Sequence, residues 1–306
     1  MLLYAARRLM QMVPVLLGAS LLIFTLMQLV PGDPVFVVLG EHASDEAIEA
    51  VRHELGLDEP FVSRYLAWLG GVVQGDLGRS VIDSRDVATE FLRRLGPTLR
   101  LVAASMLIAV LIGVPTGLVA ATRRGSLWDG TSRVFALFGL SMPNFWVALI
   151  LIMIFSVHLR VLPSSGAETF AHLILPAIAL GSSRVGLVMR LTRSALLDVL
   201  SQDYVRSARA KGLSEPVVTM KHALRSAMLP VVTIVGLEFS VLLGGSVIVE
   251  TVFSWPGIGR FTYERMLERD YPMIMGSLMF YVLILSFVNL LVDLLYVLLD
   301  PRIRYD

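Results

Sequence analysis

The chain has 306 residues, of which 56% are hydrophobic and only 17% are charged, and its mean hydropathy is +0.73. Soluble domains are about 45–50% apolar and about 25% charged. This composition therefore excludes an ordinary water-soluble protein and predicts an integral membrane protein. The net charge of +1 argues against a nucleic-acid-binding surface. The absence of cysteine from the chain excludes disulfides, thiolate metal sites and a cysteine nucleophile.

A helix needs about 20 apolar residues to cross a bilayer. Six windows of this length are almost free of charge: residues 9–30, 101–122, 134–157, 170–191, 226–249 and 271–299. We therefore expect six transmembrane helices, with both chain termini on the same side. A cleaved signal peptide is the alternative for the first window, although its apolar run is long and no small-residue cleavage site follows it.

The distribution of Lys and Arg predicts the orientation. With the N-terminus in the cytoplasm, the inner segments hold 15 cations and 6 acids, whereas the outer segments hold 11 cations and 17 acids. We therefore expect both termini to be cytoplasmic.

The expected domains are the N-terminus with the first span (1–30), an outer segment (31–96) and a core of five spans (97–306). In the outer segment, Ser44 is placed to cap a helix whose first turn contains Asp45 and Glu46. Residues 61–69 form a second, apolar and aromatic stretch. We expect a small helical cap on the membrane surface, which serves either as a spacer or as a docking surface for an external partner.

The inner loop 193–229 has the pattern of two short helices at an angle. Gly212 suits a helix C-cap, Ser214 an N-cap, and Pro216 the first turn of the next helix. Small residues in the first helix would permit close approach to another surface; these are Ser207, Ala208 and Ala210. A basic loop that only sets topology is the simpler alternative.

No catalytic pattern is evident. Neither of the two lysines follows the glycine spacing of a nucleotide-binding loop, and the five histidines are scattered. Charged residues inside spans are functional candidates. Arg184 and Asp293 lie toward the expected inner ends, where a long side chain can reach the interface. Glu238 lies nearer mid-span and is expected to face a partner or a water-filled cavity, and Asn144 beside Pro143 is a further pathway candidate.

Several different short motifs are distributed along nearly the whole chain: Pro31-Gly-Asp-Pro34, Leu55-Gly-Leu-Asp58, Gly75-Asp-Leu-Gly78, residues 203–213, His222-Ala-Leu-Arg225 before Leu229-Pro230, residues 250–259, Arg269-Asp-Tyr-Pro272, residues 289–296 and residues 300–304. In this order they resemble the permease subunits of bacterial ATP-binding-cassette (ABC) importers of the dipeptide, oligopeptide, glutathione and nickel group. The resemblance implies an all-α integral membrane protein with six transmembrane helices in the type I importer permease fold. It also implies that the chain transports a di- or oligopeptide or glutathione by alternating access.

The inner loop matches the coupling motif of that family, with Arg206-Ser207-Ala208 in the place of Glu-Ala-Ala and with Gly212 as its glycine. The replacement of the acid by Arg206 puts a glutamate-specific contact in doubt, but not the coupling role. The residues that the resemblance assigns to ATPase coupling are Arg206, Ser207, Ala208, Arg209, Ala210, Lys211, Gly212, Leu213 and Ser214.

The implied partners are a second permease subunit, two ABC ATPase subunits and a periplasmic or lipid-anchored substrate-binding protein, in the bacterial inner membrane. ATP and Mg²⁺ would bind to the ATPases, and this chain would hold no cofactor or metal. Pathway candidates are Glu238, Asn144 and Arg184, and candidates for docking of the binding protein are Asp76, Arg79 and Trp255. The alternatives are an ion-coupled secondary transporter, a permease for nickel or another small solute, and a membrane enzyme.

Overall fold

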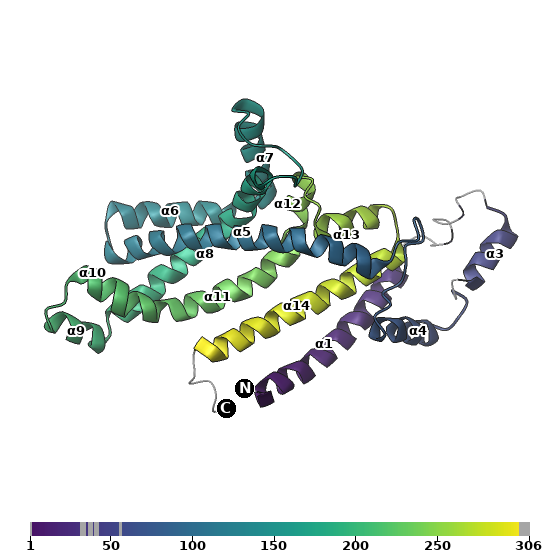
Figure 1. The fold of residues 1–306 in the computed structure, drawn as a ribbon, viewed down its shortest axis with the longest axis horizontal. Coiled ribbons are helices and arrows are strands. Elements are labelled where there is room, and N and C mark those ends of the chain that lie inside the picture. Colours follow the sequence, from purple (N-terminus) through teal and green to yellow (C-terminus); the bar gives the residue numbers. More distant parts are fainter. Residues whose placement is uncertain (1, 31–34, 36–38, 40–42, 55–56, 300–306) are drawn as a thin grey trace. The chain divides into compact units, whose positions relative to one another are not determined.

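A computed structural model describes residues 2–30, 35, 39, 43–54 and 57–299 (Figure 1). Apart from one isolated bridge between Arg79 and Asp86, the regular structure of these residues is helical, which confirms the all-α prediction. The chain forms two compact units. Unit 1 comprises residues 1–96 and 257–290, and unit 2 comprises residues 97–256 and 291–306.

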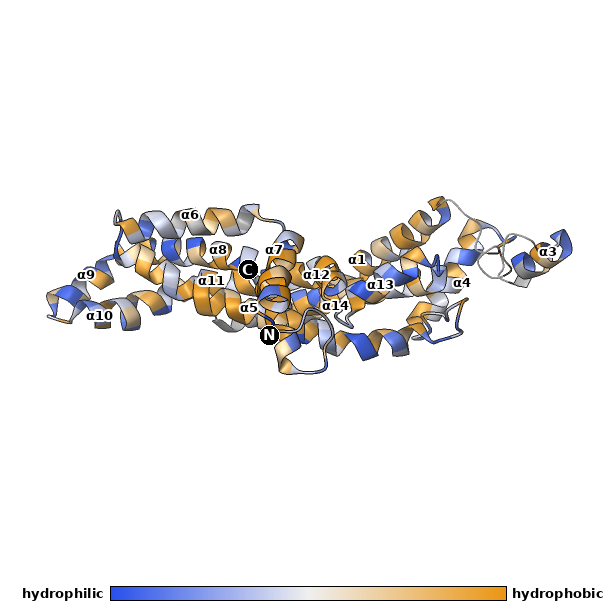
Figure 2. Cartoon of the chain, turned by 90° about the horizontal axis from the view of Figure 1, so that it is seen from above, coloured by the Kyte–Doolittle hydropathy of each residue, from blue (hydrophilic) through white to orange (hydrophobic). Residues whose placement is uncertain are grey.

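Among the described residues, five stretches of helix are long and apolar enough to cross a membrane. They belong to α1 (Leu2–Leu29), α5 (Val87–Thr122), α8 (Phe170–Leu200), α11 (Leu224–Gly245) with the turns before it, and α14 (Tyr271–Leu299). Hydrophobic residues predominate along several of these helices (Figure 2). Apolar side chains also lie exposed on them, among them Leu111 on α5 and Val241 on α11, as expected for surfaces that face lipid.

The third expected span is not one continuous helix. It consists of α6 (Leu127–Ser141), α7 (Asn144–Leu151) and the π-helical turn η1 (Ile152–His158), and the chain bends by more than 40° between α6 and α7. Met142, with φ −83° and ψ 125°, leaves the helical region directly before Pro143. A residue before proline disfavours the helical conformation, so Pro143 accounts for the break.

In unit 1, the outer segment contains α3 (Asp45–Glu54) and α4 (Phe61–Val73). The predicted cap at Ser44 is confirmed, since its Oγ accepts a hydrogen bond from Ala47 N–H at 3.4 Å. The aromatic residues of α4 pack against α1: the ring centroid of Phe24 lies 5.6 Å from those of both Tyr65 and Trp68. Ser20 and Tyr65 share a hydrogen bond of 2.9 Å. The predicted apolar stretch thus packs against the first span.

In unit 2, glycines let the helix backbones approach closely. An added Cβ on Gly117 of α5 would lie 2.6 Å from the carbonyl oxygen of Met189 on α8. A Cβ on Gly181 would lie equally close to the carbonyl oxygen of Ser105, and one on Gly186 to that of Ala136 on α6. Helices in a membrane associate through such small residues, because lipid is as apolar as a leucine side chain. The result is a closely packed arrangement of α5, α6 and α8.

Candidate functional site: an exposed helical loop and an intramembrane ion pair

The inner loop forms two short helices, as predicted. The helix α9 (Asp203–Ala210) is capped at Lys211 and followed by Gly212, whose φ of +78° lies in the left-handed region that favours glycine. The chain then enters α10 (Glu215–Val217) and the π-helical turn η2 (Val218–Ala223), which continue into α11. Ser214 occupies the predicted N-cap position, but its side chain makes no capping hydrogen bond.

Internal contacts hold the two helices of the loop together. Val205 and Ala208 of α9 pack against Val218 of η2, and all three are buried. The guanidinium of Arg209 donates to Glu215 at 2.7 Å and 3.3 Å. These hydrogen bonds hold the pKa of the Glu215 carboxyl below its ordinary value and raise the pKa of Arg209. The loop is therefore braced by an apolar cluster and by a bidentate ion pair.

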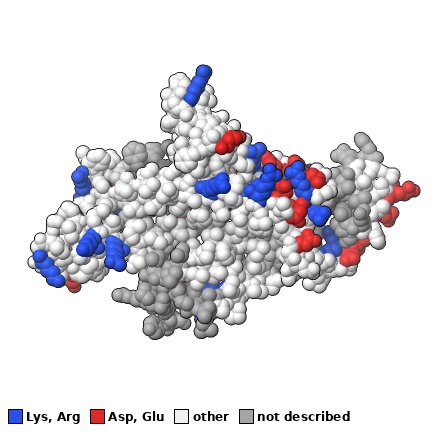
Figure 3. All heavy atoms as spheres, in the orientation of Figure 1, with Lys and Arg blue, Asp and Glu red and all other residues white. Residues whose placement is uncertain are grey.

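Eight of the nine residues expected to contact an ATPase are exposed, and Ala208 is the exception. The small side chain of Ala208 packs within this chain, in a cluster with Val205 and Val218. Exposed apolar side chains flank the expected residues, with Tyr204 at 45% and Met220 at 56% exposure. Lys and Arg gather on this end of unit 2 (Figure 3). The loop thus presents a mixed basic and apolar surface that is suited to a protein partner.

Arg184 and Glu238 form an ion pair between α8 and α11, with 2.9 Å between Nη1 and Oε2. Arg184 lies near the middle of the 31-residue α8. The expectation that Glu238 faces a partner is confirmed. Asn144 is partly exposed at the start of α7, and no described contact links it to this pair. Asp293 is partly exposed on α14.

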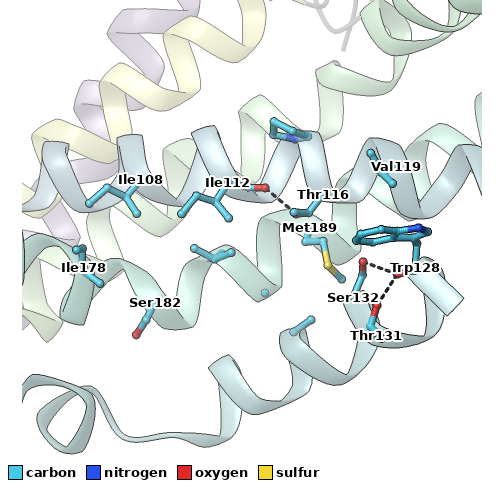
Figure 4. Close-up of a pocket in the computed structure, with 14 residues that line it drawn as sticks. Ile108, Ile112, Thr116, Val119, Trp128, Thr131, Ser132, Ile178, Ser182 and Met189 are labelled. Carbon is cyan, nitrogen blue, oxygen red and sulfur yellow. Dashed lines mark hydrogen bonds between the residues drawn. The ribbon is translucent and has the colours of Figure 1, made fainter. Parts of the chain in front are cut away.

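A cavity of about 650 Å³ lies between α5, α6 and α8 (Figure 4). Ile112 and Met189 line it, with Trp128 at one end. Its hydroxyl groups bond to carbonyls of their own helices: Thr116 to Ile112, Thr131 to Leu127, Ser132 to Trp128 and Ser182 to Ala179. With these hydroxyl hydrogens already engaged and a mostly apolar lining, the cavity suits an apolar chain better than a polar solute.

The three expected docking residues are not equivalent. Asp76 and Arg79 are exposed in unit 1, where Asp76 accepts a hydrogen bond from Gly78 N–H at 2.9 Å. Trp255 in unit 2 is only 4% exposed, and its indole donates to the carbonyl of Pro97 at 3.0 Å. A buried indole with a satisfied N–H is not available for docking, so Trp255 is a structural residue in this conformation.

The sequence pattern did not single out Glu250 as a buried residue, because it was counted only among the charges of the outer segments. It belongs to the short helix α12 (Val247–Val252), is fully buried, and accepts hydrogen bonds from Thr98 at 2.7 Å and Ser246 at 3.0 Å. Its place directly after an apolar window was the available signal. In the described part of the chain, no group of three or more His, Asp or Glu residues is arranged to hold a metal ion.

The long apolar helices define a multi-span membrane protein. Residues 113–305 match the family described as "Binding-protein-dependent transport system inner membrane component", and residues 1–102 match its N-terminal companion. The chain belongs to this family of ABC importer permeases, as the sequence motifs indicated, and is a multi-pass inner membrane protein.

Similar proteins cover the full chain. The glutathione transport system permease protein GsiC of Escherichia coli strain K12 is 44% identical over 305 residues and 100% of both chains. The protein of the same name from Shigella boydii is 43% identical over the same length.

Solved structures share the fold. A chain of the MetNI methionine ABC transporter aligns with a TM-score of 0.58 at 17% identity, covering 69% of this chain and 96% of its own. A chain of an amino acid ABC transporter aligns with a TM-score of 0.53 at 17% identity, covering 68% and 94%. These alignments support the predicted permease fold.

Proposed function

We propose that this chain is the permease subunit of an ATP-driven importer of glutathione or related peptides, and that it forms half of the translocation pathway. The chain is 44% identical over its full length to a glutathione permease, which supports glutathione or a related peptide as the substrate. The observation that carries the proposal is the exposed, internally braced loop of α9, α10 and η2, which joins α8 directly to α11.

The loop acts as a lever between an ATPase and the membrane. Its exposed face binds the ATPase, and its buried residues transmit force to the spans, because Val205 and Ala208 pack on η2. The brace between Arg209 and Glu215 keeps the two short helices in one orientation while they move. Closure of the ATPases on ATP then opens the pathway outward, and hydrolysis returns it to the inward-open state.

The complex contains a second permease subunit, two ATPase subunits with ATP and Mg²⁺, and a substrate-binding protein. This chain holds no cofactor. The exposed Asp76 and Arg79 belong to the surface that meets the binding protein on the outer side. The basic inner loop lies in the cytoplasm together with both termini.

The test uses Ala210, which is small and exposed on α9. Ala210→Trp adds bulk to the docking face without entering the buried cluster of the loop. We expect normal insertion of the chain, but a fall of about ten-fold or more in uptake per mole of permease, since the ATPase can no longer seat. Uptake in proteoliposomes and co-purification of the ATPases measure this.

Ala210→Ser is the matched control, because it keeps a small side chain and should behave as the unchanged protein. Wild-type uptake by Ala210→Trp would contradict the assigned docking face. Uptake that persists without ATPase subunits, driven by an ion gradient, would instead identify a secondary transporter.

A further inference from the structure

The ion pair between Arg184 and Glu238 is poorly satisfied for two charges inside a membrane protein. Nη1 of Arg184 lies 2.9 Å from Oε2 of Glu238, but the two groups are not aligned as a hydrogen bond. Nε of Arg184 is buried and has no hydrogen-bond partner. A guanidinium carries five N–H donors, and this one makes a single ionic contact in the described structure. It therefore retains capacity for a second carboxylate.

A second ion pair of the same unit shows what a structural pair looks like. Arg193 of α8 donates to both carboxylate oxygens of Asp129, at 2.8 Å and 3.0 Å, and Asp129 is only 1% exposed. Asp129 also accepts from Gly125 N–H at 3.1 Å. This bidentate geometry gives a strong and specific contact. Arg184 and Arg193 are nine residues, about two and a half turns, apart on α8, so the same helix carries one arginine with a bidentate partner and one without.

The less satisfied pair is also accessible. The side chains of Arg184 and Glu238 are 22% and 19% exposed, with Nε of Arg184 and Oε2 of Glu238 buried. Both lie in helices that are long and apolar enough to cross a membrane, and charges inside spans are costly and generally face a water-filled cavity or a pathway. A solute that moves along the exposed side can therefore reach both groups.

Together with the proposed function, on which this inference rests, the geometry points to a charge-exchange site. The carboxylate of a passing peptide binds the guanidinium of Arg184, and its ammonium group takes the place of Arg184 beside Glu238. Guanidinium matches a carboxylate bidentately, which the internal pair does not achieve. Glutathione carries both kinds of group, as does any peptide with free ends.

Exchange of partners keeps each charge compensated. Without substrate, Arg184 and Glu238 neutralise one another, so neither charge is left unpaired in a medium of low dielectric constant. With a zwitterionic substrate, each protein charge gains an opposite charge from the solute. Because Arg184 and Glu238 are poorly aligned with one another, their own ion pair does not prevent the substrate from binding.

The test compares two matched double variants in the complete transporter, reconstituted with its binding protein. Arg184→Gln with Glu238→Gln removes both charges but keeps polar side chains of similar size, so no bare charge remains. We expect the complex to assemble and hydrolyse ATP, and the maximal rate of glutathione uptake per complex to fall about ten-fold or more. The binding-protein concentration at half-maximal rate should not change.

Asp129→Asn with Arg193→Gln is the control, since it removes both charges of the bidentate ion pair. It should lower the yield of complex but leave the maximal uptake rate per assembled complex unchanged. Arg184→Lys is the second variant, which keeps the charge and the ion pair but loses the planar fork. We expect it to assemble normally and to import glutathione several-fold more slowly.

The outcomes separate the two proposals. Wild-type uptake by the Gln/Gln variant, or by Arg184→Lys, would overturn the charge-exchange site while leaving the proposed function intact. An unmodified complex that imports neither glutathione nor a dipeptide would contradict the proposed function, and with it this site.

Discussion

Asp83 and Arg265 join the outer segment to α13 (Ile258–Leu267), the helix before the last span, within unit 1. Nη2 of Arg265 lies 2.9 Å from Asp83, and Nη1 lies 3.5 Å from the fully buried Asp270. Asp270 also accepts a hydrogen bond from Ser80 at 2.5 Å. Residues 80–83 are thus tied to the start of α14 by charge-assisted contacts, which are stronger than neutral hydrogen bonds.

These contacts predict a pH dependence. Burial opposes ionisation of Asp83, but hydrogen bonds from Ser80, Arg85 and Arg265 outweigh it and hold the pKa of Asp83 below its ordinary 3.8. A lowered folded-state pKa means that the charge stabilises the folded form above pH 3.8, and that this stabilisation is lost as the pH falls through the folded-state value. Limited proteolysis of the outer segment between pH 7 and pH 2.5 should therefore accelerate at the acid end.

Asp83→Asn should be cleaved faster than the unchanged protein at pH 7. Its cleavage rate should also rise less between pH 7 and pH 2.5, because one titrating contact is gone. Asp58→Asn, at an exposed position of the same segment, is the control and should follow the unchanged protein. An unaltered acid profile in Asp83→Asn would show that other carboxylates govern the response.

Close helix packing in unit 2 depends on positions where no side chain fits. Gly113 and Gly117, four residues apart on α5, face Val188 and Met189 of α8. An added Cβ on Gly117 would also lie 2.8 Å from Cβ of Thr192. Backbone and β-branched atoms cannot yield as a flexible side chain can, so both helices would have to move apart.

Gly117→Ala should therefore destabilise the protein by about 1–3 kcal/mol, the usual range for overpacking. Thermal unfolding in detergent measures this as a lower midpoint. Gly130→Ala on α6 is the matched control, since its Cβ would meet no atom within 4 Å. That change should be neutral or stabilising, by up to about 1 kcal/mol, because alanine favours the helix. Equal midpoints for the two variants would contradict the close approach of α5 and α8.

The whole chain offers a direct test of its topology, because it contains no cysteine. Lys211 lies exposed in the inner loop, and Asp58 lies exposed in the outer segment. With both termini in the cytoplasm, a membrane-impermeant maleimide should label Asp58→Cys in cells whose outer membrane is permeabilised. It should label Lys211→Cys only after the inner membrane is disrupted. The reverse pattern would invert the predicted orientation.

Much of the architecture was predictable from local patterns. Charge-free windows located the long helices, since 20 apolar residues have few alternatives to a span. Gly212 and Pro216 marked the helices of the inner loop, because each restricts the backbone locally. A proline inside a span, such as Pro143, removes a backbone hydrogen bond, but whether it bends the span or breaks it depends on what packs around the freed backbone.

The predictions that failed concern residues whose role depends on distant neighbours. Trp255 belongs to a motif that was assigned to the outer surface, yet its indole reaches the carbonyl of Pro97. Ala208 was one of the small residues expected to permit close approach to another surface, and the surface that it contacts within this chain includes Val218. Glu250 was one charge among many in the outer segments, and only the structure shows that it is buried and accepts a hydrogen bond from Thr98.

The amino-acid sequence was sufficient to establish the class of protein, the approximate spans and the family, because hydropathy and short motifs are local properties. The tertiary structure decided which charges meet. Arg184 and Glu238 are 54 residues apart in the chain, and nothing in their local context pairs them. They meet because α8 and α11 lie side by side, and that packing depends on the shape of whole helix faces. The net charge of +1 thus conceals ion pairs of different geometry, among them the bidentate pair of Arg193 with Asp129 and the poorly aligned pair of Arg184 with Glu238.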